Sequence, residues 1–293
     1  ESASSAAVAF DLDTTAPAAP TAVVLANDTG VASDDQITSD ASLDVTTAEQ
    51  GGTVEYSLDG GTTFTETYDA STLTDGEQTV SVRQVDAAGN ESAASAAVAF
   101  DLDTTAPAVT NLGVSNSDIQ FDSDEAGTAE VDGAQDNTGI NVTNGTNTFT
   151  PTAETSDAVT GTFNVTDAAG NIGSSSGQIG LGTSGHNTLS GGANDDVLFG
   201  FGGDDTITGG AGADMLNGGN GDDTYVFGIN DVTGNETLAI SNGTDTLSTS
   251  GADGPVDFTA LNSSSSNLSM VDRILIDGGQ KATFTGAQLN DEP

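Results

Sequence analysis

The sequence predicts an all-β protein: tandem β-sandwiches, then a parallel coil of short strands, then a β-rich C-terminal region. Short stretches of alternating apolar and polar residues recur about 8–15 residues apart, between Gly, Asn and Asp turns, as in sandwiches. No stretch shows a convincing helical period. Residues 182–226 repeat a nine-residue pattern, and a strict short period of this kind indicates a coil.

The first predicted sandwich spans residues 14–103. Residues 1–20 (ESASSAAVAFDLDTTAPAAP) match residues 91–110 (ESAASAAVAFDLDTTAPAVT) at an offset of 90 residues. We therefore interpret residues 1–13 as the last strand of a preceding module. Alternating patterns predict strands within the first sandwich at Ala22–Ala26, Ser42–Thr46, Val54–Leu58, Thr79–Val85 and Ser95–Phe100.

A second, shorter sandwich is predicted over residues 104–179. The segment D-A-A-G-N occurs at 86–90 and again at 167–171, each time after an alternating stretch such as Thr162–Val165. Asp101 and Asp103 lie two apart, so in a strand their carboxylates share one side. The T-T-A-P segment that follows favours extended chain, which predicts a short, stiff linker.

On D-A-A-G-N and D-T-T-A-P, the first 180 residues or so resemble the bacterial Ig-like repeats of large surface adhesins. The resemblance implies calcium at module junctions, locking neighbouring domains into a rod. The alternative is that these aspartates only solvate loops and cap turns. The candidate junction ligands are Asp101, Asp103 and Asp167, and Asp11, Asp13 and Asp86 in the first module. A further calcium site is expected in the loop that carries Asp28, Asp34 and Asp35.

The nine-residue units begin at Gly182, Gly191, Gly200, Gly209 and Gly218. The sixth position holds Asp in four units and Asn187 in the first, and the eighth holds Leu, Ile or Tyr. The G-G-x-G-x-D half predicts a turn, because turn positions with positive φ exclude a Cβ. The second half predicts a short strand whose eighth residue points into a thin apolar core. A flexible linker is disfavoured, since linkers do not keep leucine or isoleucine in phase.

Stacked turns would bring the sixth-position aspartates together at one edge, where unpaired carboxylates repel. Calcium removes this repulsion because it accepts six to eight carboxylate and carbonyl oxygens, whereas magnesium demands stricter octahedral geometry. The pattern therefore predicts bound Ca²⁺.

The repeat resembles the RTX family of calcium-binding parallel β-rolls, in which alternate turns stack on the same face with calcium between them. The resemblance implies a roll over residues 180–228. The first unit departs from the motif with His186-Asn187 and is expected to be a weak or metal-free cap. By position, the side-chain ligands are Asp196, Asp205, Asp214 and Asp223. The glycines expected to support turns and carbonyls are Gly191, Gly200, Gly202, Gly209, Gly210, Gly218 and Gly219.

Residues 229–293 resemble the region that follows RTX repeats in type I secreted proteins, where further strands close the roll. A physical need supports this cap, because a roll leaves an open apolar end and bare strand edges. Strands are expected here at Asp245–Leu247, Val256–Leu261, Arg273–Ile276 and Ala282–Phe284.

The chain carries 45 acidic and 3 basic residues, a net charge of −42, which disfavours nucleic acid and anionic membranes as partners. There is no cysteine, so we expect bound metal, and not disulfide bonds, to stabilise the fold. No apolar run approaches the roughly 20 residues that span a bilayer. A lone strand frays without a sheet edge, so we expect Ser5–Phe10 to be held by another chain, in a sheet or fibre.

An enzyme is disfavoured, because the one histidine, His186, sits in a degenerate repeat turn and no cysteine is present to build a zinc cluster. Paired carboxylates leave a glycosidase open by composition, but these acids lie on glycine turns with the spacing expected for calcium. His186 is interpreted as a surface turn residue. Together with the resemblances, the sequence predicts a calcium-dependent extracellular structural segment of a bacterial adhesin, fibre or surface layer, folding after type I export. The alternative is a calcium-dependent tip module that binds sugar or peptide.

Overall fold

The computed structural model describes residues 10–115, 117–229, 231–232, 236–240, 242–249, 254–261, 271–276, 278 and 280–284. Within these ranges the regular structure is strand apart from two single-turn 3-10 helices, η1 (Ala70–Thr72) and η2 (Phe258–Ala260), which confirms the all-β prediction. The chain forms two compact units: Glu1–Thr105 with Ala168–Asn171, and Ala106–Asp167 with Ile172–Pro293.

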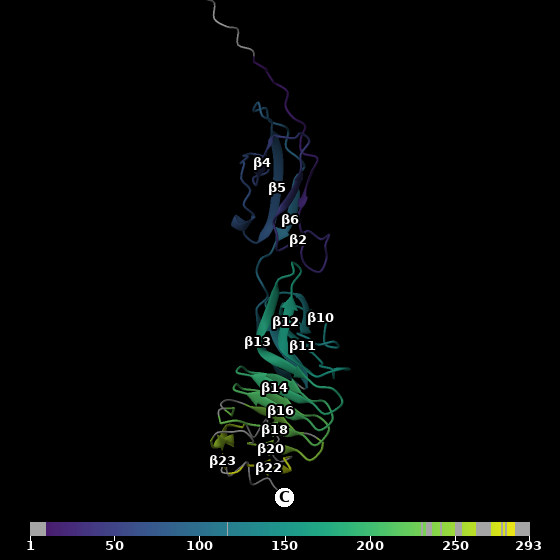
Figure 1. Cartoon of the computed structure of the whole chain (residues 1–293), viewed down its shortest axis with the longest axis vertical. Coiled ribbons are helices and arrows are strands. Elements are labelled where there is room, and N and C mark those ends of the chain that lie inside the picture. Colours follow the sequence, from purple (N-terminus) through teal and green to yellow (C-terminus); the bar gives the residue numbers. More distant parts are fainter. Residues whose placement is uncertain are drawn as a thin grey trace, which may run out of the picture. The chain divides into compact units, whose positions relative to one another are not determined.

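The first unit contains two sheets that share one apolar core. Figure 1 shows the strands of this unit in purple and blue. Alternation along β5 (Gly76–Val85) leaves Val80 and Val82 fully buried, and Phe100 and Leu102 of β6 (Val98–Leu102) pack beside Val80. The predicted strands are present, although the last begins three residues later than expected. Residues 1–9 of the predicted N-terminal strand lie outside the described residues. The two-stranded sheet pairs β1 (Ala22–Leu25) with β3 (Leu43–Thr46), and the four-stranded sheet has the order β2 (Ile37–Thr38), β6 (Val98–Leu102), β5 (Gly76–Val85), β4 (Thr53–Ser57).

The second unit begins with two sheets that enclose a core of Ile119, Phe121 and Phe163. The rings of Phe121 and Phe163 meet edge to face, 4.5 Å between centroids. The smaller sheet has the order β11 (Gly145–Phe149), β8 (Asp118–Ser123), β7 (Val109–Ser115). The larger sheet has the order β10 (Ile140–Val142), β9 (Gly127–Val131), β12 (Val159–Thr166), β13 (Ile172–Leu181), β15 (Val197–Phe199), β17 (Met215–Asn217), β19 (Thr237–Ala239).

Strand β13 joins the antiparallel part of this sheet to the repeat region. It pairs antiparallel with β12 and parallel with β15, with Ile179 opposite Val197. Val197 and Phe199 also pack into the same core as Phe163. The predicted boundary between residues 179 and 180 falls inside β13, so the structure does not separate a second sandwich from the roll there.

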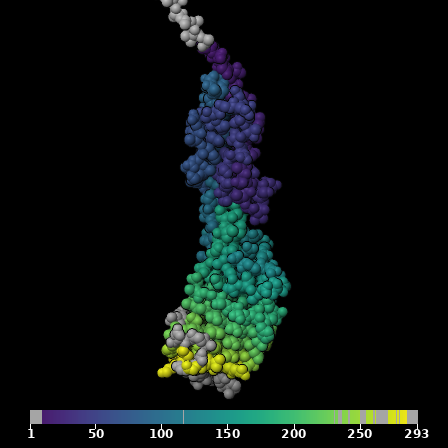
Figure 2. Space-filling model, in the orientation of Figure 1, coloured from purple at the N-terminus to yellow at the C-terminus, as the bar shows by residue number. Residues whose placement is uncertain are grey.

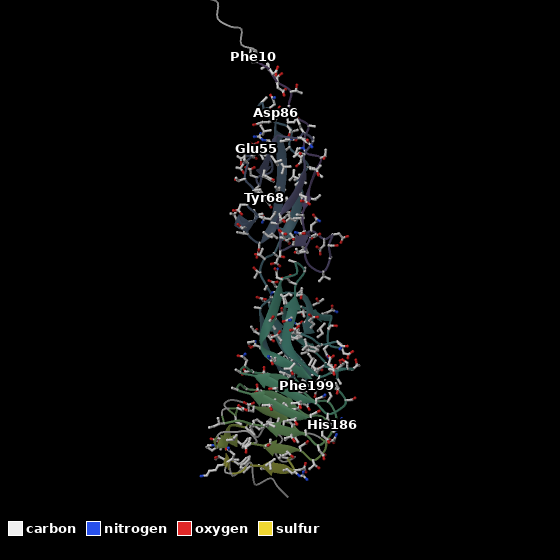
Figure 3. All side chains as sticks on the ribbon, in the orientation of Figure 1. Phe10, Glu55, Tyr68, Asp86, His186 and Phe199 are labelled. Carbon is white, nitrogen blue, oxygen red and sulfur yellow. The ribbon has the colours of Figure 1, made fainter. Side chains whose placement is uncertain are left out.

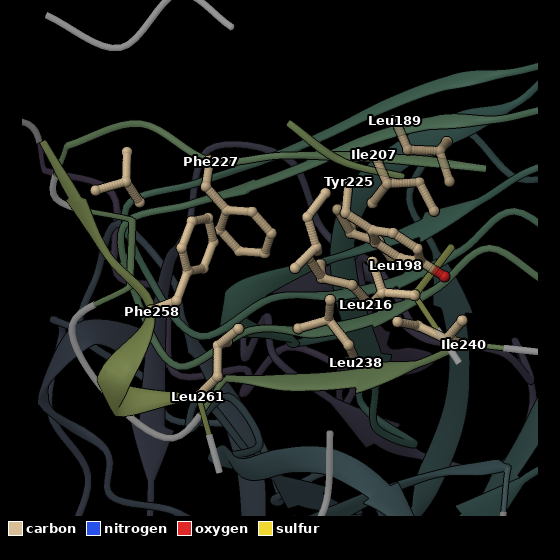
Figure 4. Close-up of a cluster of buried hydrophobic side chains, with 13 residues drawn as sticks. Leu189, Leu198, Ile207, Leu216, Tyr225, Phe227, Leu238, Ile240, Phe258 and Leu261 are labelled. Carbon is tan, nitrogen blue, oxygen red and sulfur yellow. The ribbon is translucent and has the colours of Figure 1, made fainter. Parts of the chain in front are cut away.

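The nine-residue units alternate between two parallel sheets, so one turn of the coil takes two units. The second sheet has the order β14 (Thr188–Gly192), β16 (Thr206–Gly210), β18 (Thr224–Val226), β20 (Thr246–Ser248), β22 (Arg273–Leu275). Figure 1 shows these strands stacked in order along the roll. The eighth-position residues point between the sheets, as predicted, and each is at most 1% exposed (Figure 4): Leu189, Leu198, Ile207, Leu216 and Tyr225.

The roll does not end at residue 228. Its two sheets continue through β19, β20 and β22, so the predicted boundary between roll and cap falls within the coil. The predicted strand Val256–Leu261 is wrong beyond Asp257: only β21 (Val256–Asp257) is extended, pairing with β23 (Ala282–Thr283). The Asp257 carboxylate accepts the Thr259 N–H at 3.0 Å and so starts η2. The space-filling view shows the yellow C-terminal residues at the surface beside the green turns (Figure 2).

The buried Tyr225 hydroxyl predicts a specific stability loss. It accepts the buried Gly218 N–H at 2.9 Å and donates to the Ala239 carbonyl at 3.3 Å. Tyr225→Phe should destabilise the roll by about 1–3 kcal/mol, because it leaves a buried N–H unsatisfied. Thermal melting in calcium measures this loss, and an unchanged midpoint would contradict the assigned hydrogen bond.

Candidate metal centre

The sixth-position side chains form two rows, one along each sheet. The first row is Asp196, Asp214 and Glu236; the second is Asn187, Asp205, Asp223, Asp245 and Asp272. Asp196, at the start of the first row, accepts the Gln178 N–H at 2.6 Å, and every other carboxylate accepts the backbone N–H of the row residue one coil earlier. The Asp196 N–H donates to Asp214 Oδ1 and the Asp205 N–H to Asp223 Oδ1, both at 2.9 Å and 18 residues apart. The aspartates therefore stack as predicted, but in two rows and not at one edge.

These carboxylates are buried without enough partners. Asp196, Asp205, Asp214 and Asp223 are each 1% exposed. The second oxygen, Oδ2, of the last three has no hydrogen-bond donor among the described residues. The ion pairs that the described residues form are not made by Asp205, Asp214 or Asp223. Because a buried charge without a partner is costly, these orphaned oxygens require a cation or a proton.

The first glycine of each unit shows how a cation fits. A Cβ on Gly191 would lie 2.3 Å from Asp196 Oδ2 and 2.4 Å from the Gly209 carbonyl oxygen. A Cβ on Gly200 would lie 2.2 Å from Asp205 Oδ2 and 2.5 Å from the Gly218 carbonyl oxygen. A carboxylate and a carbonyl therefore face the same glycine in these two units. This mixed oxygen set suits calcium, so the residues present fit the predicted ion.

The other predicted glycines serve the turn itself. Gly210 and Gly219 have φ of +100° and +92°, in the region that favours glycine. The equivalent position of the third unit is Phe201, whose φ of +70° is unusual for a bulky residue. Gly202 has no positive φ; it bridges to Asn220 on the next coil, and positive φ falls on Gly203 instead.

Burial also changes the acidity of the rows. It raises the pKa of Asp205, Asp214 and Asp223 to about 6, and the pKa of Asp196 in the same direction. Burial likewise raises the pKa of Glu236 to about 8. Neighbouring carboxylates add to the shift, because like charges disfavour ionisation.

A pH dependence follows for the metal-free protein. Since the folded pKa values lie above the unfolded ones, the rows favour folding below pH about 4, and this contribution is lost as pH rises through about 6 and then about 8. In EDTA the folded fraction of the roll, followed by circular dichroism, should therefore fall steadily from pH 5 to pH 8. In millimolar calcium it should instead hold or rise, because protons compete with the metal for the same oxygens. Parallel trends in the two buffers would contradict metal binding by the rows.

His186 lies at the surface of the roll, as predicted (Figure 3). Its Nδ1 accepts the Asp204 N–H at 3.0 Å, and Asp204 Oδ1 accepts the Asp222 N–H at 3.0 Å. The fifth-position side chains thus form hydrogen bonds between successive coils at the surface of the roll. Asn187 Oδ1 accepts the Thr183 N–H at 2.6 Å and replaces a carboxylate at the start of the second row.

Three row residues escaped the sequence interpretation: Glu236, Asp245 and Asp272. Each follows the repeat by a spacing other than 18 residues, which hides it from a search at fixed period. A signal was present nonetheless. G-N-E-T-L at 234–238 and G-T-D-T-L at 243–247 share the pattern of G-D-D-T-Y at 221–225.

In the first unit, the predicted Asp86 carboxylate caps its own turn. It accepts N–H groups of Ala88 and Asn90, both at 2.8 Å, and these bonds hold its pKa below the usual range, the Asn90 side chain first among them. The Asn90 amide also donates to the Asp13 carbonyl at 3.2 Å, so Asp13 and Asp86 lie at one loop. Asp11 is exposed. Calcium at this loop stays a prediction.

The loop of Asp28, Asp34 and Asp35 is also held by its own carboxylates. Asp28 Oδ2 accepts the Gln36 N–H at 3.2 Å, and Asp35 Oδ1 accepts the Ile37 N–H at 3.0 Å. Asp28 Oδ1 is buried with no hydrogen-bond donor among the described residues, whereas Asp34 is exposed. A calcium site in this loop stays a prediction.

The predicted junction residues divide between the units, with Asp101 and Asp103 in the first and Asp167 in the second. Asp103 Oδ1 accepts the Thr105 N–H at 3.1 Å. Asp75, which the sequence interpretation missed, accepts the Thr104 N–H at 2.9 Å and stiffens the T-T-A-P segment. Asp167 is 2% exposed. A shared calcium site stays a prediction.

Two stacked parallel sheets, glycine turns and buried carboxylate rows define a calcium-binding β-roll. Comparison with protein families agrees: residues 181–216 and 199–231 match the RTX calcium-binding nonapeptide repeat (4 copies). RTX nonapeptide repeats bind Ca²⁺, and the predicted cofactor is thereby confirmed. A search of the curated proteins found no match. The described part of the chain contains no helix with the length and apolarity to cross a membrane.

Proposed function

We propose that this chain is a calcium-dependent structural segment of a bacterial surface adhesin, fibre or surface layer, exported unfolded and folded outside the cell. The observation that supports this proposal most directly is the pair of buried carboxylate rows, which need a cation to be stable. Millimolar extracellular calcium supplies that cation, and weak sites are typical of extracellular modules.

The charge of the chain supports the same order of events. At low calcium, a net charge of −42 keeps the chain expanded and suitable for threading through an export channel. Binding of calcium outside the cell offsets part of this charge, and the free energy of binding contributes to the free energy of folding. RTX repeat proteins are typically secreted, which favours an extracellular site of action.

The two sheet-rich modules before the roll complete the proposal. Their D-A-A-G-N and D-T-T-A-P segments support Ig-like adhesin repeats, and the match at an offset of 90 residues supports a tandem array. The segment then acts as a stiff spacer without enzymatic activity, and further copies or other surface proteins are its partners.

Single-molecule force spectroscopy on the full chain tests this function. In millimolar calcium, unfolding of residues 182–275 should release about 30 nm of chain in a distinct force event. In EDTA that event should disappear. A roll that yields at the same force in both buffers would overturn the proposal, as would tight calcium-dependent binding to a glycan array, which would indicate a tip module.

A further inference from the structure

The outer face of the larger sheet carries a continuous apolar groove over β15, β17 and β19. Two hollows of about 120 and about 230 Å³ share Phe199 and Asn217 in their lining. Met215 and Ala239 line the smaller hollow, and Phe201 lines the larger one. We propose that this groove is a docking site for a basic segment of another protein, which inserts one aromatic side chain beside Phe199. The interaction goes beyond the spacer role and requires only the folded roll.

The register of the strands explains why apolar side chains line the groove. Because the eighth residue of each unit points between the sheets, the seventh and ninth residues face outward. On β15 the outward residues, Val197 and Phe199, belong to the core of the antiparallel strands and are 1% and 5% exposed. Phe199 lies where those strands meet the roll (Figure 3). On β17 and β19 the cover ends, since Met215 is only partly buried and Ala239 is exposed. Apolar side chains therefore meet solvent at this edge of the core.

Two residues that line the groove hold a backbone conformation that side chains rarely adopt. Ser117 has φ of +75° and Phe201 has φ of +70°, and both line the larger hollow. They are two of the four non-glycine residues with positive φ among the described residues. The next two units hold glycine at the position of Phe201, so its ring is retained at a cost in backbone strain. Strain of this kind clusters at binding sites.

The charge around the groove selects the partner. No lysine or arginine occurs between residues 106 and 272, the part of the sequence that carries the groove. Asp118 lies beside the larger hollow, because its Oδ1 accepts the hydroxyl of Thr150, a lining residue, at 2.6 Å. An acidic segment, including one from a second copy of this chain, would be repelled here. Lysine or arginine residues on either side of an apolar anchor would be attracted.

The lining selects the anchor. The rings of Phe199 and Phe201 stack, 5.8 Å between centroids, and offer their edges and faces to a third ring. The sulfur of Met215 also favours an aromatic neighbour. The Asn217 side chain forms no hydrogen bond within the described part of the chain, so its amide is available to the backbone of a docked segment. A sugar ring would need more hydrogen-bonding groups than this mostly apolar lining supplies.

Titration of the full chain in millimolar calcium with acetyl-Arg-Phe-Arg-amide tests the docking site. Met215 is one of two methionines, so methyl NMR of isotope-labelled methionine, assigned with Met215→Leu, reports from inside the groove. The Met215 resonance should shift saturably. Acetyl-Arg-Gly-Arg-amide lacks the anchor and acetyl-Glu-Phe-Glu-amide reverses the charge, and both should bind at least about tenfold more weakly. No shift with the first peptide, or equal affinity for all three, would overturn the inference.

Substitutions separate binding from folding, with thermal melting as the check on the fold. Ala239→Leu fills the smaller hollow and should weaken binding of acetyl-Arg-Phe-Arg-amide at least about tenfold. Ser190→Leu is the matched control, because Ser190 is exposed at the ninth position of a unit in the other sheet, and it should leave the affinity unchanged. Equal losses in these two variants would overturn the inference.

Phe201→Gly asks whether the strained ring serves binding. It should fold, because glycine adopts this φ without a Cβ penalty, and it should weaken peptide binding at least about tenfold. A ring that only packs against the core would give a lower melting temperature with unchanged affinity, which would overturn the inference. If Phe201→Gly does not fold, the comparison of Ala239→Leu with Ser190→Leu decides. Saturable shifts of the Met215 resonance with N-acetylglucosamine, and none with the peptide, would indicate a sugar site instead.

Discussion

Removal of calcium with EDTA should unfold residues 182–275 before it affects the first unit. When the free calcium concentration is about 100 times the dissociation constant of a site, binding at that site stabilises the fold by ~2.7 kcal/mol. The free energy lost with several such sites therefore exceeds the free energy of unfolding of a typical domain. The chain holds three tyrosines and no tryptophan. Tyr225 lies in the roll core, whereas Tyr56 and Tyr68 stack in the first unit, 5.2 Å between ring centroids.

Fluorine NMR of 3-fluorotyrosine-labelled protein separates these reporters. Titration with EDTA should move the Tyr225 resonance to its unfolded position while the other two keep their folded shifts, and excess calcium should restore it. Magnesium at the same concentration is the control and should restore less, because it gives up water reluctantly. A Tyr225 resonance that does not shift when EDTA is added would contradict the calcium dependence of the roll.

Gly210→Ala should destabilise the roll by about 2–5 kcal/mol. Gly210 has φ of +100°, and a Cβ there would lie 2.1 Å from the Gly192 carbonyl oxygen. The left-handed backbone costs about 1–2 kcal/mol for a residue with a Cβ, and forcing extra volume into packed structure typically adds about 1–3 kcal/mol. The loss should lower the melting temperature in calcium by on the order of 10 °C.

Gly192→Ala provides the matched control, because Gly192 pairs with Gly210 on the neighbouring strand. Its φ is not positive, and the atom nearest to a new Cβ would be Asp196 Oδ2 at 3.9 Å. Alanine there should leave stability unchanged or raise it by up to about 1 kcal/mol. Equal losses for the two variants would contradict the assigned turn conformation.

The repeat itself is predictable from sequence because its period fixes both the turn and the core. The eighth-position residues, from Leu189 to Tyr225, point inward as the pattern requires, and the sixth-position aspartates stack in two rows, one along each sheet. The strands of the first unit are similarly predictable, because β5 alternates around Val80 and Val82. In these places a local pattern determines which face is buried.

The extent of the roll is not predictable from a fixed period. Glu236 and Asp245 keep the register of the rows across a spacing of 22 residues. The backbone hydrogen bonds between coils are also preserved there, because the Thr237 and Thr246 N–H groups donate to the Asp214 and Asp223 carbonyls at 2.8 Å. The connection that β13 makes between the antiparallel and the parallel part of the sheet is not predictable for a different reason. One strand pairs antiparallel on one side and parallel on the other, and long-range pairing leaves no local mark in the sequence.

Isolated aspartates are the least predictable candidates. Asp86 and Asp35 both precede turns, where a carboxylate caps backbone N–H groups whether or not a metal is present. The same residue type thus serves two purposes, and only burial together with an unused oxygen distinguishes them. Asp205, Asp214 and Asp223 meet both conditions, whereas Asp86 uses both of its oxygens as acceptors.

Native mass spectrometry of the folded wild-type chain, with and without chelator, tests the central claim most directly. We expect several calcium ions per chain in millimolar calcium, all lost together with the compact charge distribution of the roll when EDTA is added. A folded chain that carries no calcium, with the same compact charge distribution in both buffers, would contradict it.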